Sequence, residues 1–261
     1  MFERLVPINV TQHAKAKVKE IKGYTFADKF QLASIMLQEF PRASSAYPII
    51  FIEDKARDEF RPVALLGLEP NENLFVDAAG DWQGSYIPAI IRRYPFALAR
   101  ADRDDKFTVC IDEASPLVST SDGADLFTEA GEPTPVLENV KRYLIGLQQM
   151  EVLTQEFCRI LAEKNMFAPL NMQIHTSGGI KNIPGGYVIN EERLNHLSDE
   201  SFLSLRTKNL LPAIYAHLRS IAQIEQLFKM KMDAKQKDES FPLTATADAV
   251  PGDGEEAPSV H

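Results

Sequence analysis

Hydrophobic residues recur at helical spacing through one long stretch of the chain, residues 134–164. The apolar positions are Leu137, Val140, Leu144, Leu147, Met150, Leu153, Phe157, Ile160 and Leu161. Thr134 followed by Pro135 is a typical helix start, because threonine caps the first turn and proline is tolerated there. The pattern predicts one long helix packed on a sheet. A coiled-coil interface is the alternative, but Gly146 interrupts the heptads.

Shorter apolar runs bounded by turn residues predict strands. These runs are residues 48–53, 62–68, 73–77, 94–99, 106–111, 170–175 and 186–189. The second and third flank a turn-rich loop, which predicts a hairpin. Residues 5–22 alternate alanine and valine with lysine, which predicts a further strand with a lysine-bearing solvent face. A basic nucleic-acid patch is the alternative for that stretch, and its short alternating pattern disfavours it.

Other apolar patterns predict further helices. One covers residues 25–40, with Thr25 as its cap and Pro41 at its end. Pro88 begins a short helix, and residues 191–196, 200–206 and 210–230 form a C-terminal cluster. Together the patterns predict an α+β fold, in which a mainly antiparallel sheet packs against the long helix and the helical cluster. We expect a single domain over residues 1–235.

Two polar stretches interrupt these patterns. Residues 112–133 are turn-prone and predict a long surface loop anchored by Leu126 and Phe127. Residues 236–261 predict a disordered acidic tail, because they are rich in small residues and carry six acids against one base. The formal net charge is −9, so residues 1–235 carry −4. This mildly acidic body disfavours a nucleic-acid-binding face.

The cysteines, the apolar runs and the histidines indicate the cellular compartment and the classes of site to expect. Cys110 and Cys158 lie in apolar segments and form no disulfide framework, which is typical of buried, reduced thiols in a cytoplasmic protein. No apolar run reaches the length of a transmembrane helix, and no signal core follows Met1. The five histidines are scattered without metal-ligand spacing, so we expect neither a metal nor a cofactor. Oligomeric state is not predicted.

The densest stretch of the chain is residues 81–96, which hold the only tryptophan, two tyrosines and an arginine pair. Paired arginines bind a carboxylate or phosphate well, and two acids follow a predicted strand just before the long loop. The candidate binding residues are Trp82, Tyr86, Arg92, Arg93, Tyr94, Asp112 and Glu113. The alternative interpretation is internal: an arginine pairs with one of these acids, and the aromatic residues fill the core. No catalytic residue is assigned.

In order along the chain, several segments resemble the SapC family of bacterial proteins, named after a component associated with surface layers. They are Tyr47-Pro-Ile-Ile-Phe, Val63-Ala-Leu-Leu-Gly-Leu, Glu72-Asn-Leu-Phe-Val-Asp, Trp82, Tyr86-Ile-Pro-Ala, Ile91-Arg-Arg-Tyr-Pro-Phe, Cys110-Ile-Asp-Glu-Ala, Leu126-Phe, Gly131-Glu-Pro-Thr-Pro, Asn190-Glu-Glu-Arg-Leu-Asn and Ile214-Tyr-Ala-His-Leu. The resemblance covers roughly residues 5–228. Members look like soluble proteins often encoded near halogenase-like enzymes, cupin-type proteins and TonB-dependent receptors, which implies a link to nutrient uptake or modification.

Three functional hypotheses follow. The first is a non-enzymatic binding or accessory protein that holds a small anionic ligand or a partner protein. The second is a structural protein associated with a surface layer, as the family name implies. The third is an enzyme that uses Asp112 or Glu113 as its acid or base, which requires a pocket that brings the carboxylate to a substrate.

Overall fold

The computed structural model describes residues 1–100, 107–170, 173–176, 179–182 and 186–239, and the fold is α+β. The strands are β1 (Leu5–Pro7), β2 (Lys17–Val18), β3 (Leu32–Ser34), β4 (Ile49–Asp54), β5 (Glu59–Leu65), β6 (Phe96–Arg100), β7 (Phe107–Asp112), β8 (Val118–Ser119), β9 (Ala124–Asp125), β10 (Phe167–Pro169), β11 (Gln173–Thr176), β12 (Gly179–Asn182) and β13 (Gly186–Ile189). The α-helices are α1 (Val10–His13), α2 (Phe40–Ala43), α3 (Ala89–Arg92), α4 (Pro135–Glu163), α5 (Glu191–Asn195), α6 (Asp199–Thr207), α7 (Leu211–Ser220) and α8 (Gln223–Glu239), and the 3-10 turns are η1 (Thr25–Ala27) and η2 (Leu37–Glu39).

Two sheets carry most of the strands. The larger has the order β10-β13-β4-β5-β3 and the smaller has the order β1-β7-β6. Strand β2 pairs with β8 and β9, and β11 pairs with β12. Every strand pairing within the described ranges is antiparallel, as the sequence predicts.

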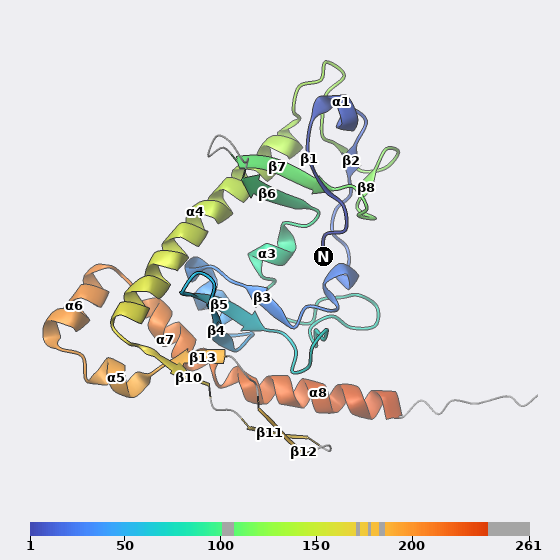
Figure 1. Cartoon of the computed structure of the whole chain (residues 1–261). Helices are drawn as coiled ribbons and strands as arrows, with labels where there is room; N and C mark the ends of the chain where they lie inside the picture. The colour runs from blue at the N-terminus through green and yellow to red at the C-terminus, as the bar shows by residue number, and fades with distance from the viewer. Residues whose placement is uncertain (101–106, 171–172, 177–178, 183–185, 240–261) are drawn as a thin grey trace, which may run out of the picture.

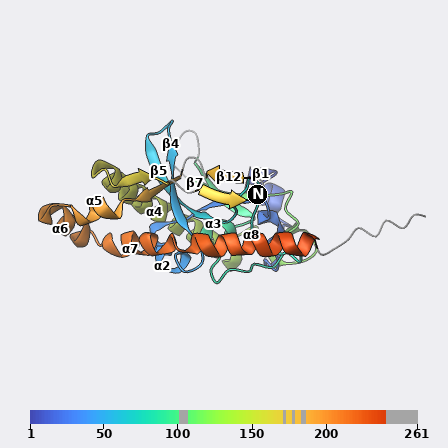
Figure 2. The same cartoon turned by 90° about the horizontal axis from the view of Figure 1, so that it is seen from below.

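Helix α4 runs past both sheets, and α3 lies between them (Figure 1). The side chain of Thr134 caps the first turn of α4, as predicted. Helix α4 packs on β5, while α7 packs on β4 and β13. Figure 2 shows α7 and α8 following one another end to end. The predicted long helix and C-terminal cluster are therefore confirmed.

Buried side chains form two clusters, one for each sheet. The larger contains fully buried aromatics, among them Phe40, Tyr47, Phe51 and Phe157. The smaller is mostly aliphatic and includes Leu126 of the predicted loop. Leu126 is fully buried and Phe127 nearly so, which confirms both residues as the anchor of residues 112–133.

Four local predictions are wrong. Residues 5–22 form β1, α1 and β2 instead of one strand, because Asn9 accepts from the amide of Gln12 and caps a short helix. Residues 25–40 form two 3-10 turns and β3, because β3 completes the larger sheet by pairing with β5. The strand at 62–68 pairs with β4, while residues 73–77 form no strand beyond a bridge from Val76 to Trp82. The predicted helix 210–230 is two helices, α7 and α8.

Two predictions touch residues outside the described ranges. Of the predicted strand 170–175, residues 171–172 lie outside them, residues 173–175 belong to β11, and residue 170 follows the end of β10. The predicted disordered tail begins at residue 236, but α8 continues to Glu239. The rest of that tail, residues 240–261, lies outside the described residues.

Candidate functional site

The stretch from Asp81 to Phe96 connects the two sheets. It begins at the bridge between Val76 and Trp82, passes through α3 and enters β6. Helix α3 begins after Pro88, as predicted, because the fixed φ of proline suits the residue before a first turn. The predicted aromatic and arginine residues therefore lie between two packed layers, where polar atoms need partners.

Trp82 belongs to a hydrogen-bonded aromatic group. Its Nε1 donates to the hydroxyl of Tyr47 at 3.0 Å and to the carbonyl of Tyr86 at 3.1 Å. The Tyr47 hydroxyl itself donates to that carbonyl. Gly84 makes room for this arrangement, since a Cβ there would lie 2.7 Å from the Tyr47 hydroxyl and 2.8 Å from Trp82 Nε1. Trp82 is therefore a structural residue, consistent with the interpretation that aromatics fill the core.

A buried carboxylate, Glu39, lies on the other side of Tyr86. Its Oε1 accepts from the Tyr86 hydroxyl at 2.6 Å and from the amide of Ala89 at 2.8 Å, and its Oε2 accepts from the amide of Met36 at 2.8 Å. The residue is only 6% exposed. Burial, and then the hydrogen bond to Glu39, raise the pKa of Tyr86 to about 12. Glu39 thus joins η2 to the start of α3.

Arg92 is exposed, yet its guanidinium is held in place. Its Nε donates to the carbonyl of Ile87 at 2.9 Å, and its Nη2 donates to the Tyr86 hydroxyl at 3.3 Å. The guanidinium carbon lies 5.6 Å from the ring centre of Tyr86 and 5.9 Å from that of Tyr143. Its Nη1 has no hydrogen-bond partner within the described ranges. The outer N–H groups therefore remain available for a carboxylate, with the side chain already ordered.

Arg93, the next residue, faces the interior. Its guanidinium carbon lies 5.6 Å from the ring centre of Phe2, and its buried Nε lacks a hydrogen-bond partner in the described part of the chain. Burial lowers the pKa of Arg93, and the nearby Glu151 opposes that effect. Tyr94 is also buried and stacks on Phe26 with ring centres 4.2 Å apart. Both residues are therefore less accessible to a ligand than Arg92.

Asp112 is fully buried at the end of β7. It accepts from the amides of Glu3 at 3.0 Å, Arg4 at 2.9 Å and Ala114 at 3.2 Å. These bonds fix the chain segment before β1 against β7. Both of its oxygens accept from main-chain donors and the side chain is fully buried, so among the described residues this carboxylate is closed to a substrate.

Glu113 also pairs away from the arginine stretch. Its carboxylate lies 2.7 Å from Arg4 Nη2 and 3.0 Å from His13 Nε2. Among the ion pairs of the described residues, none joins Arg92 or Arg93 to Asp112 or Glu113. The predicted pairing of Arg92 or Arg93 with one of these acids is therefore wrong for the described residues. The seven candidate residues do not form one site; Arg92 and Tyr86 are the pair that offers a charged group to solvent.

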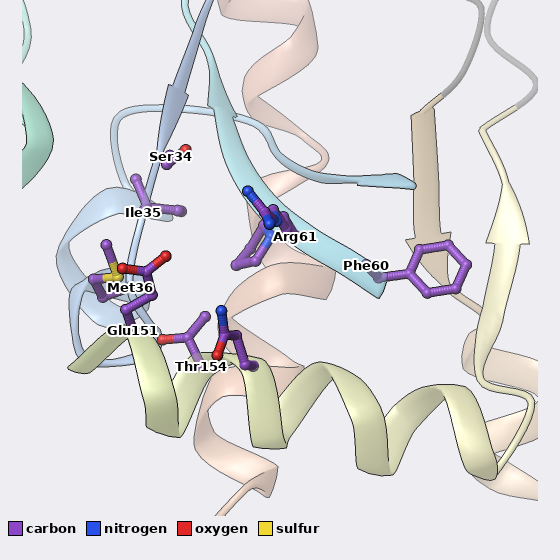
Figure 3. A pocket seen from close by; sticks show the side chains of 9 residues that line it. Ser34, Ile35, Met36, Phe60, Arg61, Glu151 and Thr154 are labelled. Atoms are coloured by element: carbon purple, nitrogen blue, oxygen red, sulfur yellow. The ribbon is translucent and has the colours of Figure 1, made fainter. Parts of the chain in front are cut away.

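A cavity of about 50 Å³ lies between β5, the turn before η2 and α4 (Figure 3). Residues that line it include Met36, Arg61, Glu151 and Thr154, none of which the sequence analysis selected. Small-molecule sites occupy roughly 300–1,000 Å³, so this cavity is too small to enclose a metabolite.

The electrostatics of this cavity also disfavour an anion. Arg61 Nη2 lies 3.4 Å from Asp54 and 3.7 Å from Glu59, so two carboxylates already balance its charge. Glu151 adds a third carboxylate from α4 (Figure 3). A bound carboxylate would face a net negative surrounding there. The cavity is therefore not the anion site that the sequence predicts.

Glu39 and Tyr143 position Tyr86 and Arg92, yet neither is among the residues predicted from the sequence. Tyr143 lies on α4 and donates to the carbonyl of Ala89 at 3.2 Å. Both are distant from residues 81–96 in the chain. No signal in the sequence points to Glu39, because the apolar spacing of residues 25–40 places position 39 on the opposite, polar side of the predicted helix.

The described residues contain no group of three or more His, Cys, Asp and Glu side chains placed to bind a metal ion. None of their helices has an apolar stretch long enough to cross a bilayer.

Comparison with known proteins gives one positive result. No curated protein and no solved structure matches the chain. The model of the SapC family matches residues 8–227, which is most of the chain, in agreement with the resemblance of its motifs. The chain belongs to the SapC family.

Proposed function

We propose that this SapC-family protein is a non-enzymatic binding or accessory protein that recognises a carboxylate through Arg92. The observation that carries the proposal is the guanidinium of Arg92, which is exposed but fixed by Ile87, Tyr86 and Tyr143. An ordered arginine loses little conformational entropy when it binds a carboxylate with two parallel hydrogen bonds. The aromatic rings also stabilise its charge.

The carboxylate belongs to a partner protein in this proposal. The described cavity is too small and too acidic to hold the body of an anionic metabolite, whereas an aspartate or glutamate of a partner reaches an exposed arginine without a pocket. The family resemblance implies nutrient uptake or modification systems, and their components are the first candidates for that partner.

The acid/base hypothesis has less support. Asp112 is fully buried and bonded to three main-chain amides, and Glu113 pairs with Arg4 and His13. A general base must come within hydrogen-bond reach of its substrate, and neither carboxylate faces the described cavity.

The test is a titration of the protein with a short glutamate peptide and with its glutamine counterpart, followed by NMR at the backbone amide resonances of α3, which the wild type and the Arg92 variant both have. We expect a saturable shift with the glutamate peptide alone. Arg92→Gln should weaken binding by about 10- to 100-fold, because one charge-assisted bidentate contact contributes about 1.5–3 kcal/mol. Arg206→Gln is the matched control, since Arg206 is an exposed arginine on α6. Equal binding by wild type and Arg92→Gln contradicts the proposal. Equally tight binding of succinate would favour a small anion instead.

A further inference from the structure

The outward face of α4 carries large apolar side chains that the fold leaves uncovered. Ile145 is 49% exposed, and Val152 and Leu153 are each 55% exposed. They lie within about two turns, opposite the face on which Leu144, Leu147 and Phe157 are buried. A helix that packs on one side normally has polar residues on the other, and clustered apolar residues on a surface mark interaction sites.

Charged residues flank this apolar patch in a particular order. Glu138 and Arg142 precede it, and Glu156 and Arg159 follow it, so these four charges give the order negative, positive, apolar, negative, positive. Within the helix, Glu138 also pairs with Lys141, and Arg159 pairs with both Glu156 and Glu163. Arg142, Glu156 and Arg159 are all exposed. When the same helix is laid alongside in the opposite direction, each negative residue faces a positive one. A parallel arrangement would place like charges opposite each other.

The same reversal matches the shapes of the side chains. Gln149 lies at the centre, with Arg142 and Glu156 seven residues on either side of it. Ile145 and Leu153 lie four residues before and after Gln149, and Gly146 and Val152 lie three residues before and after it. A Cβ added to Gly146 would have no atom within 4 Å, so the glycine leaves a notch on the surface. The Val152 of a second helix fits opposite that notch.

We propose that a second copy of this chain covers the face, in a symmetric antiparallel dimer with Gln149 on the twofold axis. A twofold interface requires one self-complementary patch, and the charge order and the notch of α4 meet that requirement together. A single helix face buries less than the ~800 Å² per partner of a standard interface, so we expect a dissociation constant on the order of 10–100 µM. The interface is independent of Arg92.

Charge reversal tests the pairing of Arg142 with Glu156. Within one helix these residues are roughly 21 Å apart, so they contact each other only between copies. Sedimentation equilibrium of the full chain should show a concentration-dependent dimer that Arg142→Glu weakens about tenfold, through two repelling surface pairs. The double variant with Glu156→Arg should recover it, because the reversed charges attract again. Arg219→Glu, an exposed reversal on α7, should leave it unchanged.

A symmetric crosslink tests the position of the axis. Gln149→Cys should form a disulfide with its own copy on mild oxidation, whereas Ala162→Cys, also exposed on α4, should not. The two native cysteines are buried and should not react. A protein that stays monomeric over the whole concentration range overturns the proposal. So does a dimer that Arg142→Glu leaves intact, or crosslinking of both cysteine variants to the same extent.

Discussion

Two buried carboxylates, Glu39 and Asp112, hold the two halves of the molecule in different ways. Asp112 accepts from three main-chain amides, two of which belong to the segment just before β1. Glu39 receives two amides and the hydroxyl of Tyr86, a side chain that in turn holds Arg92. One carboxylate fastens a chain end, and the other connects the interior to a charged surface.

The hydrophobic clusters around the two carboxylates also differ: one is mainly aliphatic and the other contains a polar network. The smaller cluster around Ile111 and Leu126 is largely aliphatic, so Asp112 supplies a local anchor at its edge. The larger cluster contains a connected polar group, in which the side chains of Trp82 and Tyr47 both donate to the carbonyl of Tyr86. Polar networks in a core are stabilising when every member is satisfied and costly when one is removed. We therefore expect the loss of a polar group to lower the free energy of unfolding more in the larger cluster than in the smaller one.

The largest effect is expected for Glu39→Ala. The change leaves two buried amides and one hydroxyl without an acceptor, and it should lower the free energy of unfolding by about 3–5 kcal/mol. Chemical denaturation measures this loss. Glu39→Gln is the matched variant and should lose less, since its amide oxygen still accepts from Tyr86 and Ala89. A loss below about 1 kcal/mol for Glu39→Ala would contradict the role given to this carboxylate.

Low pH should also destabilise the larger cluster, through protonation of His217 on α7. Its Nε2 accepts from the amide of Ile189 at 3.0 Å, and burial lowers the pKa of His217 to about 4. An unfolded histidine titrates near pH 6.5, so the unfolded state binds the proton first as the pH falls. This group should cost about 3 kcal/mol of stability between pH 7 and 4, with no cost above pH 7.

The measurement is the free energy of unfolding of the wild type and of His217→Gln over that pH range. The variant should show a shallower fall with acid, although it is less stable at neutral pH. His13→Gln is the control from the smaller cluster, because His13 is also buried but lies 3.0 Å from Glu113. Parallel curves for the wild type and His217→Gln would rule out this origin of acid sensitivity.

Sequence patterns predicted the elements whose contacts are local. Helix α4 has its own cap and apolar spacing, and β4, β6 and β7 are continuous apolar runs, so each is visible in a short window. Residues 25–40 were predicted as a helix because Phe26, Phe30, Leu37 and Phe40 recur at suitable spacing. These side chains are indeed buried or partly buried, but Phe26 and Leu37 lie on the turns η1 and η2, and Phe40 begins α2. Pairing of β3 with the distant β5 overrides the local preference.

The candidate site was predicted less well, for a related reason. Residues 81–96 were selected because they are dense in aromatics and arginines. Trp82 and Tyr86 do pack against the larger cluster, and Tyr94 and Phe96 are buried. The sequence could not assign Arg92 to the surface and Arg93 to the interior, because that choice depends on Tyr143 and Phe2 from distant segments. Composition identified the right region, while long-range contacts decide the role of each residue.

A smaller and more local effect is expected for Asp112→Ala. The free energy of unfolding should fall by about 2–3 kcal/mol, since buried amides lose a charged acceptor. The loss should be concentrated where β1 pairs with β7, so amide exchange of Val6 and Ile8 should accelerate more than exchange in the larger sheet. Asp122→Ala, in an exposed turn, should change neither quantity. Uniform acceleration across both sheets would show that Asp112 supports the whole fold.

The smallest effect is expected for Tyr86→Phe, which separates the two roles of Glu39. The change removes one of the three donors to the carboxylate and the hydroxyl that accepts from Arg92, so unfolding should become easier by about 1 kcal/mol. Binding of the glutamate peptide should weaken about threefold as well, because Arg92 keeps its bond to Ile87 but loses one point of fixation.

A double-mutant cycle of Tyr86→Phe with Glu39→Gln measures whether the interior carboxylate reaches the surface arginine through Tyr86. Coupling of about 0.5–1 kcal/mol in both stability and peptide binding is expected for residues in direct contact within one network. Coupling in stability without coupling in binding would mean that Glu39 only holds the two layers together. Glu39 would then be an anchor of the same kind as Asp112, and the difference between the two carboxylates would lie in what they fasten rather than in what they position.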